Sequence, residues 1–112
     1  MKKIQILFST LCFLGLTGVV LAADVDAQAA ETLAKQNGCL KCHAVDKAKD
    51  APSYKSVAAK YKGKPDAEAK LMKHITTGPK VKFEDGHEEE HKIIKTTDEE
   101  RQRNLVRWIL SQ

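Results

Sequence analysis

The chain has 112 residues, with 19 Lys and Arg against 15 Asp and Glu, and 42% of its residues are hydrophobic. This length fits one small domain and argues against a large multi-domain enzyme. The excess positive charge is slight, and no basic cluster is interleaved with aromatic residues, so nothing in the composition points to nucleic acid.

The first segment is typical of a secretory signal peptide. Residues 2–3 are positively charged, an apolar run follows over residues 4–20, and residues 22–23 supply the small side chains of a cleavage site. Cleavage after Ala23 would leave residues 24–112 as one domain, exported to the periplasm and free of the membrane. An uncleaved anchor is the alternative, because the apolar run is close to the lower length limit for a membrane helix.

Four short helices are predicted after this leader, with no convincing strand pattern. Each shows apolar residues at helical spacing and a start or stop signal at its ends: residues 27–37, 53–62, 66–77 and a last helix that begins at residue 97. The second of them has one clear apolar face, formed by Tyr54, Val57, Ala58 and Tyr61.

The last predicted helix begins with a capping motif, and two long connections join the predicted helices. Thr97 and Glu100 fit the capping box, in which each side chain satisfies a free backbone N–H of the other residue. Residues 41–51 and 79–96 are long connections in so small a domain. A loop as long as residues 79–96 is uncommon in such a domain and is usually functional.

Cys39, Cys42 and His43 form a C-x-x-C-H motif at the start of the first long connection. This is the attachment motif of a c-type haem. Two thiols on one turn can add to the two vinyl groups of a porphyrin edge, and the histidine that follows offers its imidazole to the iron. Cys12 would leave with the leader, so one covalent haem c would use both remaining cysteines.

Other uses of these residue types are less well supported. A redox-active thiol pair needs a βαβ setting, which the helical pattern lacks, and a disulfide between Cys39 and Cys42 would close a very small loop. Residues 87–91 read H-E-E-E-H and match the zinc protease motif H-E-x-x-H. That motif needs a long helix, whereas here it follows Asp85 and Gly86 in a polar loop.

Because it carries this C-x-x-C-H motif, the chain resembles the small bacterial class I c-type cytochromes over nearly the whole length of residues 24–112. The resemblance rests on the motif after one helix, on Pro52 ten residues beyond Cys42, and on a terminal helix that reads LVRWILS. It implies an all-α cytochrome c fold, with about four short helices wrapped around one covalently attached haem. One difference is Ala51, where the family usually has glycine.

The resemblance also implies roles for residues around the haem. The Pro52 carbonyl would accept the ring N–H of His43 and so orient this proximal ligand. The terminal helix would cross the first one, and Trp108 would then face Leu33 and the haem edge. We expect Tyr54 and Trp108 to contact the cofactor.

The second axial ligand of the iron is the open question. The family usually supplies a methionine from the loop before the last helix, and residues 79–96 contain none. Counting back from Asp98 to the place where that methionine typically stands reaches His91. Histidine is a strong haem ligand, so we expect iron bound by His43 and His91.

Several alternatives to His91 stay open. They are His87 in the same loop, His74, Met72, a lysine, or no protein ligand at all. Met72 lies beside Leu71 and Ile75 at helical spacing, and such a methionine usually fills core.

The sequence therefore favours a periplasmic mono-haem electron carrier, not an enzyme, that exchanges single electrons with periplasmic redox proteins. Lysines in the segments around the haem could steer acidic partners: Lys35, Lys41, Lys47, Lys49, Lys80, Lys82, Lys92 and Lys95. The alternative function is a haem protein that binds or senses a small gas through a displaceable distal ligand. A peroxidase is disfavoured, because no distal acid–base pair is visible.

Overall fold

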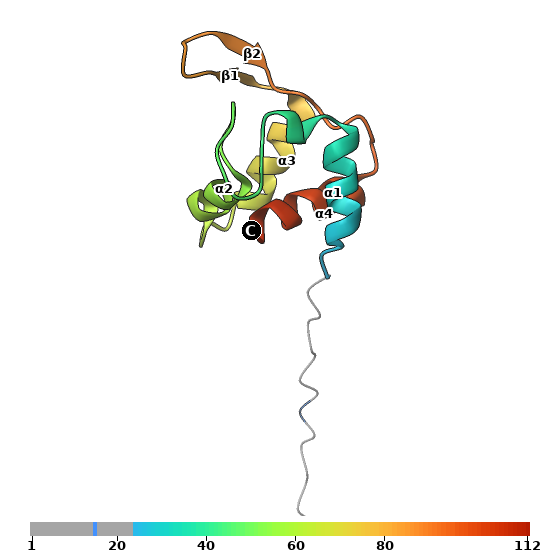
Figure 1. Cartoon of the computed structure of the whole chain (residues 1–112). Coiled ribbons are helices and arrows are strands. Elements are labelled where there is room, and N and C mark those ends of the chain that lie inside the picture. The colour runs from blue at the N-terminus through green and yellow to red at the C-terminus, as the bar shows by residue number, and fades with distance from the viewer. Residues whose placement is uncertain (1–14, 16–23) are drawn as a thin grey trace, which may run out of the picture.

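The computed structural model describes Gly15 and residues 24–112, so the expected leader and Cys12 lie outside the described residues. The described part contains four α-helices, one short 3-10 turn and one two-stranded hairpin (Figure 1). The predicted all-α architecture of four short helices is confirmed as a mostly helical fold. In this part of the chain no helix is both long and apolar enough to cross a bilayer.

The first and last helices form the centre of the core. Helix α1 (Ala27–Gln36) packs against α4 (Glu99–Leu110), as the resemblance implied (Figure 1). Leu33 of α1 lies in one buried cluster with Leu105 and Trp108 of α4. Their apolar stripes meet because both helices repeat hydrophobic residues every three to four positions.

A pair of side chain to backbone hydrogen bonds joins these two helices at one end. The Asn104 side chain accepts from the Asp26 backbone N–H at 2.9 Å and donates to the Asp26 carbonyl at 2.8 Å. Asp26 is also the N-cap of α1, where its carboxylate accepts from the Ala29 N–H. The start of α1 is therefore fixed to α4.

Helices α2 (Tyr54–Tyr61) and α3 (Ala67–Thr77) lie against the other side of α4. The hydroxyl of Ser53 caps α2, and Gly78 ends α3 in the left-handed conformation at φ +60°. Of the apolar face expected on α2, Tyr54 is fully buried, while Val57, Ala58 and Tyr61 are half-buried.

The last helix begins differently from the prediction. The capping box on Thr97 was wrong, because the N-cap is Asp98. One carboxylate oxygen of Asp98 accepts from the backbone N–H groups of Glu100 and Arg101, at 3.1 and 3.2 Å. A charged carboxylate is a stronger acceptor than a hydroxyl and favours the positive end of the helix dipole, so the cap lies one residue later.

The expectation of no strands was also wrong. Strands β1 (Lys80–Lys82) and β2 (Glu88–Glu90) pair antiparallel in the loop before α4 and project beyond the helices (Figure 1). Lys80 lies opposite Glu90 and Lys82 opposite Glu88, so unlike charges face each other across the ladder. The five-residue turn between the strands contains Gly86 at φ +90°.

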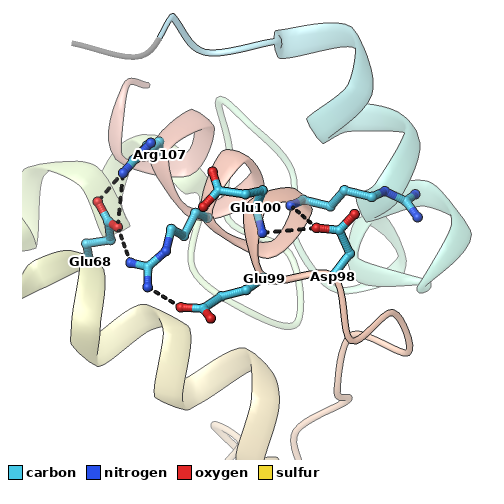
Figure 2. Close-up of polar contacts among 7 residues, drawn as sticks. Glu68, Asp98, Glu99, Glu100 and Arg107 are labelled. Carbon is cyan, nitrogen blue, oxygen red and sulfur yellow. Dashed lines mark hydrogen bonds and ion pairs between the residues drawn. The ribbon is translucent and has the colours of Figure 1, made fainter.

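A network of ion pairs joins α3 to α4. The carboxylate of Glu68 accepts from Arg107 Nε at 3.1 Å and from Arg103 Nη1 at 2.8 Å, and Arg103 also pairs with Glu99 (Figure 2). These donors, Arg107 first, hold the pKa of Glu68 below its usual value. The carboxylate is therefore charged over most of the pH range and fixes α3 against α4.

Candidate functional site

The C-x-x-C-H motif forms a tight turn directly after α1. Gly38 adopts φ +70°, and the 3-10 turn η1 (Cys39–Lys41) follows. The His43 N–H donates to the Cys39 carbonyl at 3.0 Å, which brings the ends of the motif together. Cys39 and Cys42 are half-buried and are not joined by a disulfide, so both thiols are free on the same turn.

The imidazole of His43 is oriented by a backbone carbonyl, as expected. Its Nδ1 lies 2.7 Å from the Pro52 oxygen. A carbonyl can only accept, so the proton is on Nδ1 and the lone pair of Nε2 is free for a metal. The Tyr54 ring stacks on His43 at 5.1 Å between centroids, and Trp108 meets Tyr54 edge-on at 5.5 Å.

The loop behind His43 is fixed to the motif and to α2. The Ala51 N–H donates to the Cys42 carbonyl at 3.0 Å, and the Tyr54 N–H donates to the Ala44 carbonyl at 2.9 Å. The ammonium of Lys49 donates to the Leu40 carbonyl at 3.0 Å. Pro52 is therefore held in place by bonds on both sides of it, and the loop path does not depend on the family's usual glycine.

His91 lies at the base of the hairpin and is held in a similar way. Its backbone N–H donates to the Pro79 carbonyl at 2.9 Å, which extends the β1–β2 ladder by one bond. Its ring Nδ1 donates to the Lys92 carbonyl at 2.8 Å, so its Nε2 is also free. Burial, with a smaller contribution from His74, lowers the pKa of His91, and the ring is neutral at neutral pH.

The two imidazoles lie at a spacing that suits one metal ion. The ring centroids of His43 and His91 are 6.2 Å apart, and the ring planes are inclined by 56°. An imidazole nitrogen lies about 2 Å from a first-row metal ion, so two rings on opposite sides of one ion have centroids about 6 Å apart. Together with the free thiols of Cys39 and Cys42, these donors fit a covalently attached haem with two nitrogen ligands.

The other candidate ligands have different surroundings. His87 is exposed in the turn of the hairpin, where it stacks on Phe83 at 4.2 Å and pairs with Asp85. Met72 packs against the core cluster, as its spacing indicated. The stretch that matches H-E-x-x-H forms strand β2, so the helix that a zinc protease needs is absent from residues 87–91.

One residue near the site has a position that sequence reasoning missed. His74 of α3 is half-buried, and its ring centroid lies 4.3 Å from that of His91. Its place on the predicted helix indicated a residue of the helix surface, with ligation of the iron as the alternative. No spacing rule could have placed it beside His91, because a turn and the whole hairpin separate the two residues.

Comparison with known proteins identifies the family. The cytochrome c family model matches residues 27–112. Cytochrome c-551 of Pseudomonas aeruginosa is 38% identical over 96 residues, covering 86% of this chain and 88% of the relative. Cytochrome c2 of Rhodocyclus tenuis is 40% identical over 81 residues, covering 70% and 87%. The chain belongs to the cytochrome c family.

Solved structures of cytochromes agree with this. The class 1 cytochrome MtoD from Sideroxydans lithotrophicus ES-1 superposes with a TM-score of 0.76 at 62% identity, over 79% of this chain and 97% of MtoD. Cytochrome c552 of Nitrosomonas europaea gives 0.56 at 30% identity, over 72% and 96%. The chain is thus a class I mono-haem cytochrome c, an electron carrier and not an enzyme, and its family implies covalent haem c.

Proposed function

We propose that this cytochrome carries electrons in the periplasm with its haem iron bound by His43 and His91. The observation that carries the proposal is the paired geometry of the two rings. Each donates Nδ1–H to a backbone carbonyl and leaves Nε2 free, and the centroids are 6.2 Å apart.

The remaining contacts of the cofactor follow from this assignment. Cys39 and Cys42 would form the thioether bonds to a single haem, and Pro52 would keep the proximal ring in its orientation. Tyr54 and Trp108 would supply the apolar wall on the proximal side, since Tyr54 stacks on His43 and both are buried. Haem supplies the one-electron chemistry, and the protein binds and tunes it.

Ligation by two histidines has a consequence for the reduction potential. A methionine ligand raises the potential of c-type haems, so a second imidazole in its place favours ferric iron and lowers the potential relative to His/Met relatives. The negative charges of Glu88 and Glu90 lower the reduction potential only slightly further. Lys82 and Lys80 lie directly opposite them in the hairpin and offset these charges.

Export and redox partners complete the proposal. The leader at residues 1–23 would direct the chain to the periplasm, the compartment in which we expect it to meet acidic redox proteins. Lys92 and Lys49 lie close to the motif: Lys92 approaches Gly38, and Lys49 bonds to Leu40. Cations at this position would steer partners toward the haem edge.

The test is a comparison of His91→Ala with His87→Ala. In the full chain expressed with its leader, the periplasmic protein should begin at Asp24 and show a low-spin ferric visible and EPR spectrum. His91→Ala should become high-spin and bind carbon monoxide when reduced, whereas His87→Ala should match the wild type. An unchanged low-spin spectrum in His91→Ala would contradict the ligation, and rapid carbon monoxide binding by the wild type would favour the gas-binding alternative.

A further inference from the structure

His74 is the one histidine near the site with no role in the proposed ligation. Its ring meets the ring of His91 at 4.3 Å and an angle of 61°, an edge-to-face arrangement. Among the described residues, no hydrogen bond to its imidazole is formed. The contact with His91 is therefore the specific interaction that this half-buried polar ring makes.

The backbone holds the two rings in this position. Leu71 and Ile75, on either side of His74 on the same face of α3, are buried in the core cluster. The Ile94 N–H donates to the Ile75 carbonyl at 2.9 Å, so the chain just after His91 is bonded to α3 next to His74. The edge-to-face contact is thus a fixed feature of the fold.

His91 needs such a contact. Its ring is attached to the chain at Cγ and bonded through Nδ1 to the carbonyl of the adjacent Lys92, so the ring and this carbonyl can swing together with one short segment of chain. A second contact at a different point of the ring fixes its plane. Aromatic pairs in edge-to-face geometry are favourable beyond their buried area, so the His74 ring opposes that swing.

We propose that His74 is a positioning residue that fixes the plane of the distal ligand His91 and keeps that face of the iron closed to small external ligands. The inference rests on the proposed ligation by His43 and His91. The relative orientation of two axial imidazole planes sets the d-orbital splitting of low-spin ferric iron, so EPR g values report the role directly. The rate of cyanide binding reports how readily His91 leaves.

The experiment uses holoprotein variants of His74. His74→Ala should shift the largest g value and speed cyanide binding to the ferric protein by about three- to tenfold, the factor expected for loss of one aromatic pair. His74→Phe keeps an aromatic edge and should restore both readouts. His87→Ala removes a histidine that does not contact His91 and serves as the matched control.

The outcomes separate this inference from the ligation itself. Wild-type g values and cyanide rates in His74→Ala would overturn the positioning role, even where His91→Ala confirms the ligand. If His74→Ala fails to retain haem, His74→Leu fills the same space without an aromatic edge, and wild-type behaviour of that variant would equally overturn the role. A low-spin spectrum unchanged in His91→Ala would refute the ligation and, with it, the positioning role of His74.

Discussion

Gly78 is the residue on which the path of the distal segment depends. It ends α3 at φ +60°, a conformation that residues with a side chain adopt only at a cost. A Cβ atom built on it would lie 2.8 Å from the carbonyl oxygen of His91. The backbone of His91 can approach α3 this closely only because no side chain is present at position 78.

Gly78→Ala should therefore disturb both stability and ligation. We expect a loss of about 2–4 kcal/mol in the free energy of unfolding, from left-handed strain and from the displaced His91 backbone. Denaturant unfolding of the ferric protein measures the first effect, and the cyanide binding rate measures the second, which should rise.

Gly63→Ala is the matched control for this prediction. Gly63 also has a positive φ, of +73°, but a Cβ there would meet nothing within 4 Å. It should lose only about 1 kcal/mol, with no change in cyanide binding. Equal losses in the two variants would show that crowding against His91 is unimportant.

The residues of the site differ in how far the sequence could predict them. The hydrogen bond between His43 and Pro52 was expected, because the motif and the proline lie close together in a known pattern. The Lys92 carbonyl that orients His91 was not, since a bond to the next residue's backbone has no spacing signature. The contact between His74 and His91 depends on how α3 meets the hairpin, which only the folded chain defines.

At the scale of elements, the junction of α1 and α4 depends on one side chain. Asn104 makes two hydrogen bonds to the backbone of Asp26, which is 78 residues away in the sequence. The Asp26 N–H precedes the helix and finds no partner in it, so the Asn104 amide oxygen satisfies a donor that the helix leaves free. The Asp26 carbonyl already accepts from the Ala30 N–H at 3.0 Å, and the Asn104 amide donates a second bond to it.

Asn104→Ala should lower the free energy of unfolding by about 1–2 kcal/mol, because two hydrogen bonds are lost at a half-buried position. Thermal and denaturant unfolding of the holoprotein measure the loss, and the visible spectrum should be unchanged. Gln28→Ala, at an exposed position of α1, should fall within about 0.5 kcal/mol of the wild type. A neutral Asn104→Ala would mean that apolar packing alone holds the junction.

The helices were predictable and the hairpin was not, for a physical reason. Helical spacing of apolar residues extends over ten or more positions, so each helix was found within about two residues of its ends. The two strands have three residues each and carry Lys and Glu, so neither length nor alternation marked them. Asp85-Gly86 is a hairpin turn signal and was the one feature that could have revealed the hairpin.

For the whole molecule, the ion pairs of Glu68 make stability depend on pH. The pKa of Glu68 lies below its ordinary value of 4.5, chiefly through Arg107 and then Arg103. The charged form is thus favoured by folding. The stabilisation is complete above pH 4.5 and is lost as the pH falls through the lowered pKa of the folded state.

Glu68→Gln should cost about 1 kcal/mol at neutral pH, a modest amount because about a third of the Glu68 side chain is exposed to water. The difference from wild type should disappear well below pH 4.5. Urea unfolding at a series of pH values measures it. Asp66→Asn removes a more exposed pair with Lys70 and should change the free energy of unfolding little. A difference between wild type and Glu68→Gln that does not vary with pH would contradict the prediction.

The hydrogen bonds that hold the rings of His43 and His91 to backbone carbonyls also affect the rate of electron transfer. The charge on the iron changes during electron transfer. The transfer is slower when the groups around the iron must rearrange in response to that change. His43 and His91 each donate to a backbone oxygen, on segments that are hydrogen-bonded in turn through Ala51 and Pro79. Dipoles that are already in place need little reorientation when the charge changes. The proposed centre would thus have a small contribution from these groups to the outer-sphere reorganisation energy, which suits rapid exchange during brief encounters between proteins.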